Sequence, residues 1–207
     1  MNNPNSVVYI VDDDSSVRDA ISNLLESVGL RAQTFGSTEE FLSATRTDAP
    51  SCLVLDVMLP GMRGLEFQEM LKKNCVSIPI IFITAHGDIP MTSKAMRAGA
   101  IEFLAKPFPK EDLLAAIHSG LQLDETTRAQ HAELTTLQGR FEQLSPREKE
   151  VMDLVVTGII NKQIAGQLGI SEVTVKIHRR QVMEKMNAES LADLVRMSDK
   201  LKFQMQK

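Results

Sequence analysis

Four short apolar runs in the first half of the chain constrain its fold more than any other feature of the sequence. They cover residues 7–11, 52–55, 80–83 and 101–105. Runs of this length that are rich in Val and Ile and separated by helical patterns are typical of the buried strands of a parallel sheet. The residues that follow the runs are Asp12 and Asp13, Asp56, Thr84, and Lys106. Because ligands bind beyond the carboxyl ends of such strands, we expect these side chains to meet at one edge of one sheet.

The order of the expected elements gives a fold class for the N-terminal half. Apolar residues recur at helical spacing after each run, and a further short strand is expected at 32–35. Five strand–helix units in succession predict an α/β domain with a five-stranded, doubly wound parallel sheet and helices on both faces.

Length and composition are those of an ordinary globular protein. The chain has 207 residues, 43% of them apolar and 24% charged. No apolar stretch reaches the ~18–20 residues that a membrane-spanning helix needs, and Met1–Ser6 lacks the features of a signal peptide. Cys52 and Cys75 follow no disulfide or metal pattern, so both are expected to be reduced and buried. We therefore expect a cytoplasmic protein with no membrane partner.

The charge is unevenly distributed along the chain. Residues 1–123 carry 10 basic and 15 acidic side chains, a net charge of −5, whereas residues 124–207 carry 13 and 12, a net charge of +1. Between residues 173 and 183 there are three basic side chains and no acidic one. A locally basic helix on an acidic protein makes nucleic acid a candidate partner of the C-terminal half.

After residue 144 the sequence predicts helices and no strand. Ser145, Pro146 and Glu148 stand in the order of a helix cap, a first-turn proline and a capping-box acid. Further helices are expected at 161–168 and 172–186, with a glycine-containing turn between them. Two helices joined in this way, the second of them basic, are typical of the helix-turn-helix motif, so we expect an all-α domain.

The segment 123–143 joins the two halves. It is polar, with no proline and one glycine, and carries a narrow apolar stripe at Leu134, Leu137, Phe141 and Leu144. A helical linker that continues the preceding helix is one interpretation, and a coiled-coil dimer seam is the alternative. We expect three parts: residues 1–122, the linker 123–143, and the helical domain 144–207.

The polar residues at the expected sheet edge suit a divalent cation and a phosphoryl group. Adjacent carboxylates such as Asp12 and Asp13 repel each other unless a cation lies between them, and with Asp56 they form a ligand set for Mg²⁺ or Mn²⁺. A carboxylate can act as a nucleophile towards phosphorus, while Thr84 and Lys106 can bind phosphoryl oxygens. The alternative is that the Asp residues only cap the helices that follow, which is our interpretation of Asp14.

The N-terminal half resembles a response-regulator receiver domain. The resemblance rests on Val11–Asp13, Leu55–Gly64, Thr84–Ala85 and Lys106–Phe108, and it implies a flavodoxin/CheY-like fold. It also implies that Asp56 is the phosphoacceptor of a sensor histidine kinase. Asp12, Asp13 and Asp56 would then hold the metal together with the main-chain carbonyl of Met58. Thr84 would be the switch hydroxyl, Lys106 a phosphoryl ligand and Phe103 the switch aromatic, although Phe103 could equally be a simple core residue.

The C-terminal half resembles the LuxR/NarL-type helix-turn-helix domain. The matching segments are 144–151, 161–165 and 170–178, and the combination with a receiver is similar to the FixJ-like subfamily. By this resemblance the helix 172–186 enters the major groove of double-stranded promoter DNA, where Lys176, Ile177 and Arg180 read base edges. Thr174, His178, Arg179 and Lys162 are the candidates for phosphate contacts.

Together these features predict a phosphorylation-controlled transcription regulator of a two-component system. Phosphorylation is expected to change the face formed by the fourth helix, fifth strand and fifth helix, and so to promote a homodimer; RNA polymerase is a further candidate partner. No catalysis is expected beyond self-phosphorylation and self-dephosphorylation at Asp56. The alternatives are a haloacid-dehalogenase-like Mg-dependent phosphatase with Asp12 as its nucleophile, and a phosphorylation-dependent protein-binding scaffold.

Overall fold

The computed structural model describes residues 5–85 and 89–205. The chain divides into two compact units, Met1–Arg128 and Ala129–Lys207, which are described separately below. The greater part of the segment that we examined for a signal peptide, residues 1–4, lies outside the described residues. Among those described, no helix combines the length and apolar character needed to cross a membrane.

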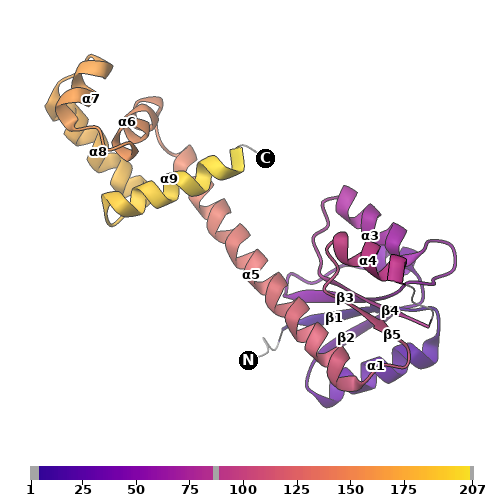
Figure 1. Ribbon diagram of the computed structural model, residues 1–207. Coiled ribbons are helices and arrows are strands. Elements are labelled where there is room, and N and C mark those ends of the chain that lie inside the picture. The colour runs from indigo at the N-terminus through magenta and orange to yellow at the C-terminus, as the bar shows by residue number, and fades with distance from the viewer. Residues whose placement is uncertain (1–4, 86–88, 206–207) are drawn as a thin grey trace. The chain divides into compact units, whose positions relative to one another are not determined.

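The first unit is built on a five-stranded parallel sheet with the order β2-β1-β3-β4-β5 (Figure 1). Its strands are β1 (Val7–Val11), β2 (Arg31–Phe35), β3 (Ser51–Asp56), β4 (Ile80–Thr84) and β5 (Glu102–Ala105). All four neighbouring pairs are parallel. The predicted doubly wound parallel sheet is therefore confirmed. The strand order reverses next to β1, between β1 and β3, and a reversal of this kind marks the ligand-binding edge of open α/β sheets.

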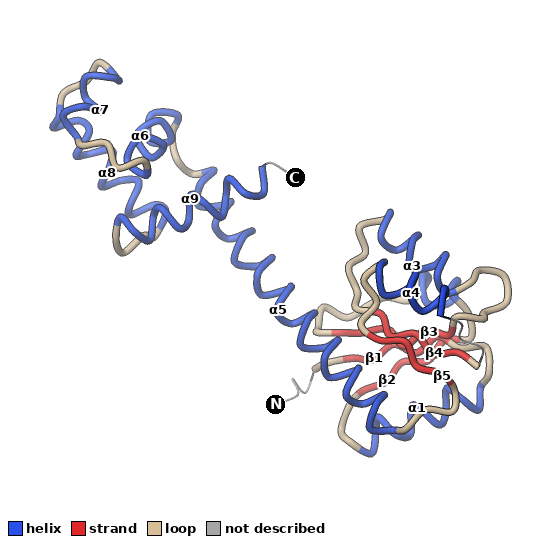
Figure 2. Tube along the Cα trace, viewed as in Figure 1, coloured by secondary structure: helices blue, strands red, loops and turns tan. Residues whose placement is uncertain are grey.

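Helices cover both faces of this sheet, as the ribbon and the tube show (Figures 1 and 2). One face packs against α1 (Ser15–Ser27) and the first part of α5 (Lys110–Glu142). The other face packs against α2 (Thr38–Ser43), α3 (Gly64–Lys73) and α4 (Ile89–Arg97). Every residue of β1 is buried, because a strand covered on both faces has no solvent side.

Side-chain caps fix where the helices begin. The carboxylate of Asp14 accepts a hydrogen bond from the backbone N–H of Ser16, so Asp14 caps α1 as expected. Ser37 caps α2 through the backbone N–H of Glu40. The cap of α1 matters for the site, because it fixes the chain direction immediately after Asp12 and Asp13.

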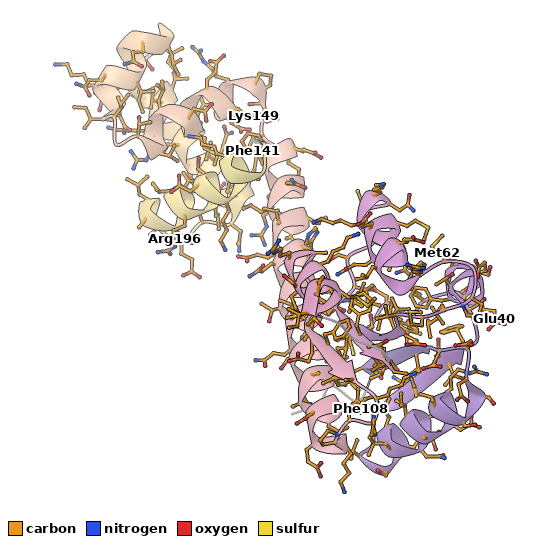
Figure 3. The ribbon with its side chains drawn as sticks, turned by 45° about the vertical axis from the view of Figure 1, so that its right-hand side comes forward. Glu40, Met62, Phe108, Phe141, Lys149 and Arg196 are labelled. Carbon is orange, nitrogen blue, oxygen red and sulfur yellow. The ribbon has the colours of Figure 1, made fainter. Side chains whose placement is uncertain are left out.

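The second unit is helical throughout its described residues. The end of α5 packs there with α6 (Pro146–Val156), α7 (Asn161–Leu168), α8 (Glu172–Met186) and α9 (Leu191–Met205). Ser145 and Glu148 form the predicted capping box at the start of α6. Gly169 ends α7 in the left-handed conformation (φ 65°), which glycine adopts without strain. Figure 3 labels Phe141 of α5 and Lys149 of α6, whose ammonium lies 4.8 Å from the centre of the Phe141 ring.

Helix α5 runs on through the segment that was expected to link the two halves. One interpretation of residues 123–143 was a helical linker that continues the preceding helix, and one continuous helix of 33 residues runs from Lys110 to Glu142. No proline interrupts this stretch, and Thr126 and Thr127 bond back to carbonyls four residues earlier without breaking the helix. The helical linker is confirmed.

The prediction for the cysteines was half right. Cys52 lies in β3, fully buried, and burial raises the pKa of its thiol far above the usual range. Cys75 is exposed rather than buried. It lies two residues after the end of α3, with φ at 56°.

Candidate functional site

Three carboxylates meet at the carboxyl edge of the sheet. Asp12 follows β1 and Asp56 ends β3, and these two neighbouring strands bring them together with Asp13. One ligand oxygen from each of the three carboxylates lies within 4.8 Å of the other two. Asp12 and Asp56 are buried and Asp13 is exposed, so the group opens to solvent on one side.

Lys106 places a positive charge among these acids. Its ammonium lies 2.6 Å from Asp12 Oδ2 and 3.8 Å from Asp56 Oδ1. The loop after β5 holds it there, since the backbone N–H of Lys106 donates to the carbonyl of Thr84 at 2.7 Å. The Lys106–Pro107 peptide bond is cis. The arrangement balances part of the negative charge and leaves Asp13 without a cation in the described site.

Asp56 is the least satisfied of the three acids. Its Oδ1 is buried and has no hydrogen-bond partner among the described residues. Burial raises the pKa of Asp56 above its usual range; the charge of Lys106 opposes the shift, the charge of Asp12 adds to it, and the backbone N–H groups of Met58 and Val57 lower it. An unpartnered, buried carboxylate oxygen beside two further carboxylates fits a divalent cation, which supplies the missing positive charge.

Thr84 lies on β4, the strand next to the one that Asp56 ends, and Phe103 lies on β5, one strand further along the sheet. Thr84 ends β4, is fully buried, and pairs in register with Ala105 of β5. Phe103 is half-buried in β5, and its ring centre lies 6.2 Å from that of Phe82 in β4. Met58 follows Asp56 in the β3–α3 loop, and its side chain is exposed. The polar residues predicted for this site therefore lie at the same edge of the sheet, whereas Phe103 is the second residue of β5 and pairs in register with Phe82 in the middle of β4.

Two further residues support the site, and neither was predicted from the sequence. Arg18 of α1 donates through Nη1 to the main-chain carbonyl of Asp12 at 2.7 Å. Gly64 begins α3 so close to β3 that an added Cβ would lie 2.6 Å from the carbonyl oxygen of Asp56. No spacing pattern points to Arg18, whereas Gly64 lies within the motif that follows Asp56.

The second group of predicted residues lies on and around α8. Val175, Val182 and Met186 face the core, as predicted. Lys176, Ile177 and Arg180 are exposed on the opposite side of the helix. Each cation pairs with a glutamate of its own helix: Lys176 Nζ lies 3.6 Å from Glu172 Oε1, and Arg180 Nε lies 2.7 Å from Glu184 Oε1.

The residues predicted for phosphate contacts differ in accessibility. Lys162 is fully exposed on α7. Thr174 is half-buried, and its hydroxyl lies 2.8 Å from that of the cap residue Ser171. Arg179 donates to Asn161 Oδ1 at 3.1 Å, which joins α8 to α7. His178 is half-buried, and its Nδ1 has no partner among the described residues. Lys162 is thus the most accessible of the four.

Comparison with known families identifies both units. The response regulator receiver domain matches residues 8–118, and the luxR family of bacterial regulatory proteins matches residues 142–198. The two matches define a two-component response regulator that acts as a transcription regulator. The chain belongs to this class, and within it to the FixJ-like regulators. A histidine kinase and DNA are the partners of such proteins, which as a class are regulators rather than enzymes.

Relatives match along most of the chain. Nodulation protein W of Bradyrhizobium diazoefficiens is 52% identical over 95% of this chain and 86% of that protein. The structure of the response regulator StyR has a TM-score of 0.86 at 51% identity and covers 94% of this chain and 98% of that one. Full-length FixJ from B. japonicum has a TM-score of 0.58 at 36% identity, with 96% and 98% covered. Neither the phosphatase nor the scaffold that we considered belongs to this class.

Proposed function

We propose that Asp56 is the residue that accepts a phosphoryl group from the histidine kinase. The observation that carries the proposal is the buried Oδ1 of Asp56, which has no hydrogen-bond partner among the described residues and lies 3.8 Å from the ammonium of Lys106. A nucleophile needs a free lone pair, and the product needs a cation near the new negative charge. Asp56 has both.

In the proposed step, one carboxylate oxygen of Asp56 forms a bond to phosphorus while the bond from phosphorus to the kinase histidine breaks. The electron pair of the broken bond stays on the histidine nitrogen. Lys106 neutralises one phosphoryl oxygen, and the Thr84 hydroxyl donates to another. Attack by water on the phosphorus later breaks its bond to the Asp56 oxygen, which releases inorganic phosphate and restores the carboxylate, so the chemistry of the chain is limited to its own phosphorylation and dephosphorylation.

Asp12, Asp13 and Asp56, with the main-chain carbonyl of Met58, are the residues that would hold Mg²⁺ or Mn²⁺. When bound, the ion supplies positive charge to the phosphoryl oxygens. Arg18 fixes the main chain at Asp12, and Lys106 holds the side chain of Asp12 in place.

The elements next to the phosphoryl site would connect phosphorylation to DNA binding. Phosphorylation brings charge to the ends of β3 and β4, to which Thr84 and the packing of Phe103 respond. We propose that the face formed by α4, β5 and the start of α5 then forms a homodimer. Two copies of α8 would bind half-sites about one helical turn apart on promoter DNA. Such a complex would work in the cytoplasm, next to RNA polymerase.

We propose a separate function for each of the three parts of the chain. Residues 1–122 receive the phosphoryl group, residues 123–143 link the two parts, and residues 144–207 bind DNA. In the last part Lys176, Ile177 and Arg180 contact base edges, since they are exposed on the side of α8 that faces away from the core. Lys162, Thr174, His178 and Arg179 contact phosphates, and these contacts position the helix.

Phosphoryl transfer to variants tests the role of Asp56. The full chain, Asp56→Asn and the matched exposed variant Asp48→Asn are incubated with a phosphorylated histidine kinase and Mg²⁺. We expect the wild type and Asp48→Asn to gain phosphate that is labile to base and to hydroxylamine, as an acyl phosphate is, and Asp56→Asn to gain none. Borohydride reduction followed by mass spectrometry locates the acyl phosphate. A reduced residue at position 12 would instead identify Asp12 as the nucleophile and would contradict the proposal.

Salt titration tests the DNA-binding role separately. A protein that neutralises several phosphates loses affinity for duplex DNA steeply as salt rises. We expect Lys162→Ala to weaken binding to all duplexes alike, and Arg180→Ala to weaken it mainly for the preferred sequence. Duplex binding that does not depend on salt would argue against this role.

A further inference from the structure

Helix α8 exposes two apolar, β-branched side chains on its outer face. Val173 is 65% exposed and Ile177 is 53% exposed. They are four residues apart, so they are neighbours on the helix surface. The opposite face is fully buried at Val175, Val182 and Met186. Val173 and Ile177 therefore contribute nothing to the core of this unit.

Folding gives no reason for a valine at position 173. Exposed apolar surface is unfavourable in water, and β-branched residues form helices less readily than most polar residues do. A single exposed apolar residue is common. Here two of them line the same face as Arg180, which was already a candidate for contacts with bases.

The place of Val173 in the helix points to DNA bases. It is the second residue of α8, and in a helix-turn-helix motif the N-terminal residues of the recognition helix contact the base edges. The apolar group that the major groove offers is the 5-methyl group of thymine. A valine at this position has no hydrogen-bonding group, so it can recognise a base only through such a contact.

We propose that Val173 is a specificity-determining residue that selects a thymine in each half-site by packing against its 5-methyl group. This inference rests on the proposed role of α8 in the major groove. Ile177, one turn further along, contacts the neighbouring step, while Lys176 and Arg180 contact polar base edges on either side. Both cations form exposed pairs with glutamates of the same helix, Lys176 with Glu172 and Arg180 with Glu184.

Uracil substitution tests this contact, because uracil differs from thymine only by the missing methyl group. The probe is a duplex selected from a randomised library by the phosphorylated full-length chain. Each thymine of the duplex is then replaced by uracil in turn. For the wild type we expect a loss of affinity of about fourfold at the contacted thymine, the size of one buried methyl group. For Val173→Ala we expect that loss to disappear at the same position and nowhere else.

Two controls separate the contact from general effects. Leu191→Ala removes another exposed apolar side chain of the same unit, at the start of α9, and should keep the full sensitivity to uracil. Val173→Thr keeps the shape and one methyl group of valine and should keep part of it. Alanine favours helices more than valine does, so circular dichroism should show α8 intact in Val173→Ala.

The outcomes also separate this inference from the function on which it rests. If Lys176→Ala and Arg180→Ala weaken binding but Val173→Ala shows the same uracil sensitivity as the wild type at every thymine, the role of Val173 is wrong and α8 remains the reading helix. If neither cation variant affects the preference for the selected duplex, α8 does not read bases, and both proposals fall.

Discussion

Asp56 lies at the end of β3 with 6% of its surface exposed, and its Oδ1 has no hydrogen-bond partner among the described residues. Burial disfavours the charged form that a nucleophile must have, and Lys106 compensates only in part. The receiver unit therefore gives up stability in order to keep this oxygen available. Such a conflict between folding and function is expected at a functional site.

We expect Asp56→Asn to stabilise the receiver unit at neutral pH in the presence of a chelator. The pKa of Asp56 is higher in the folded chain than in the unfolded one, so the wild type loses stability as pH rises from about 4 through the folded pKa. Asparagine removes that loss. The gain in the free energy of unfolding should be largest at neutral pH and should shrink as pH falls towards 4. Thermal unfolding across this range measures it, and a gain that is independent of pH would contradict the explanation.

We expect Gly64→Ala to destabilise the receiver unit and to slow phosphorylation. The added Cβ would lie 2.6 Å from the Asp56 carbonyl oxygen and 3.0 Å from Val57 Cα, both of them backbone atoms that cannot move alone. Overpacking of this kind costs about 1–3 kcal/mol. Gly36→Ala is the matched control, because its Cβ meets Glu40 Oε2 at an ordinary 3.5 Å. Chemical denaturation of both variants measures their free energies of unfolding. Equal stabilities would contradict the prediction.

For single residues, the sequence predicts the site residues that follow the ends of strands. It does not predict residues whose position depends on how the helices pack. Asp12, Asp56 and Thr84 follow apolar runs, so their meeting point is predictable from topology alone. Arg18 reaches the Asp12 carbonyl from α1, a contact that depends on how this helix packs. The prediction for Cys75 was wrong because this residue lies in the exposed turn after α3, and composition does not reveal on which element a cysteine falls.

At the scale of elements, a hydrogen bond joins α5 to β3, the strand that carries Asp56. The carboxylate of Asp124, buried in α5, accepts a hydrogen bond from the backbone N–H of Ser51 at 2.8 Å. Arg128, one turn later, donates to the same carboxylate at 2.9 Å. Ser51 begins β3 and Asp56 ends it. One strand of six residues thus joins the phosphoryl site to the helix that leads out of the receiver unit.

We expect Asp124→Ala to destabilise the receiver unit by about 1–3 kcal/mol, because it leaves the buried N–H of Ser51 without its acceptor. Hydrogen exchange should become faster at Ser51. Asp48→Ala is the control: it removes the fully exposed partner of Arg128, and exposed pairs contribute little. If the hydrogen-exchange rate at Ser51 is unchanged in Asp124→Ala, the hydrogen bond from Ser51 to Asp124 does not stabilise the start of β3.

Element boundaries were predictable wherever a cap or a turn marks them. Asp14 and Ser145 cap the helices that were expected after them. The length of α5 was harder to predict, because beyond the receiver most of its side chains face solvent. Only Leu137 there is a fully buried core residue, with Phe141 packed beside it. Such a helix leaves only a narrow apolar stripe in the sequence, here at Leu134, Leu137, Phe141 and Leu144.

At the scale of the whole molecule, the hydrophobic clusters of the two units share no residue. Those of the receiver unit end at Leu121, and that of the helical unit begins at Leu137. The fold class of each unit followed from its own pattern, strands alternating with helices in one and helices only in the other. The strand order did not follow from the pattern, because period and length are similar for every buried strand.

We expect two unfolding transitions in calorimetry, and expect Lys185→Met to lower only the one that belongs to the helical unit. Lys185 of α8 lies 2.6 Å from Glu148 Oε2 of α6, and Glu148 is 3% exposed. Loss of the cation leaves a buried carboxylate without its ion-pair partner, at a cost of about 1–3 kcal/mol. Lys200→Met, which breaks an exposed pair with Glu133, should change little. A shift of both transitions would contradict independent cores.

The outward Val173 and Ile177 have a consequence for chemically modified chromosomes. A cytosine that a methyltransferase has modified at its 5-position carries a methyl group at the same place in the major groove as thymine does. A helix that recognises this group through aliphatic contact alone has no means of distinguishing the two bases there. A methylated cytosine at the contacted position would thus offer Val173 the same methyl contact as thymine, and only the polar contacts of Lys176 and Arg180 could tell the two base pairs apart.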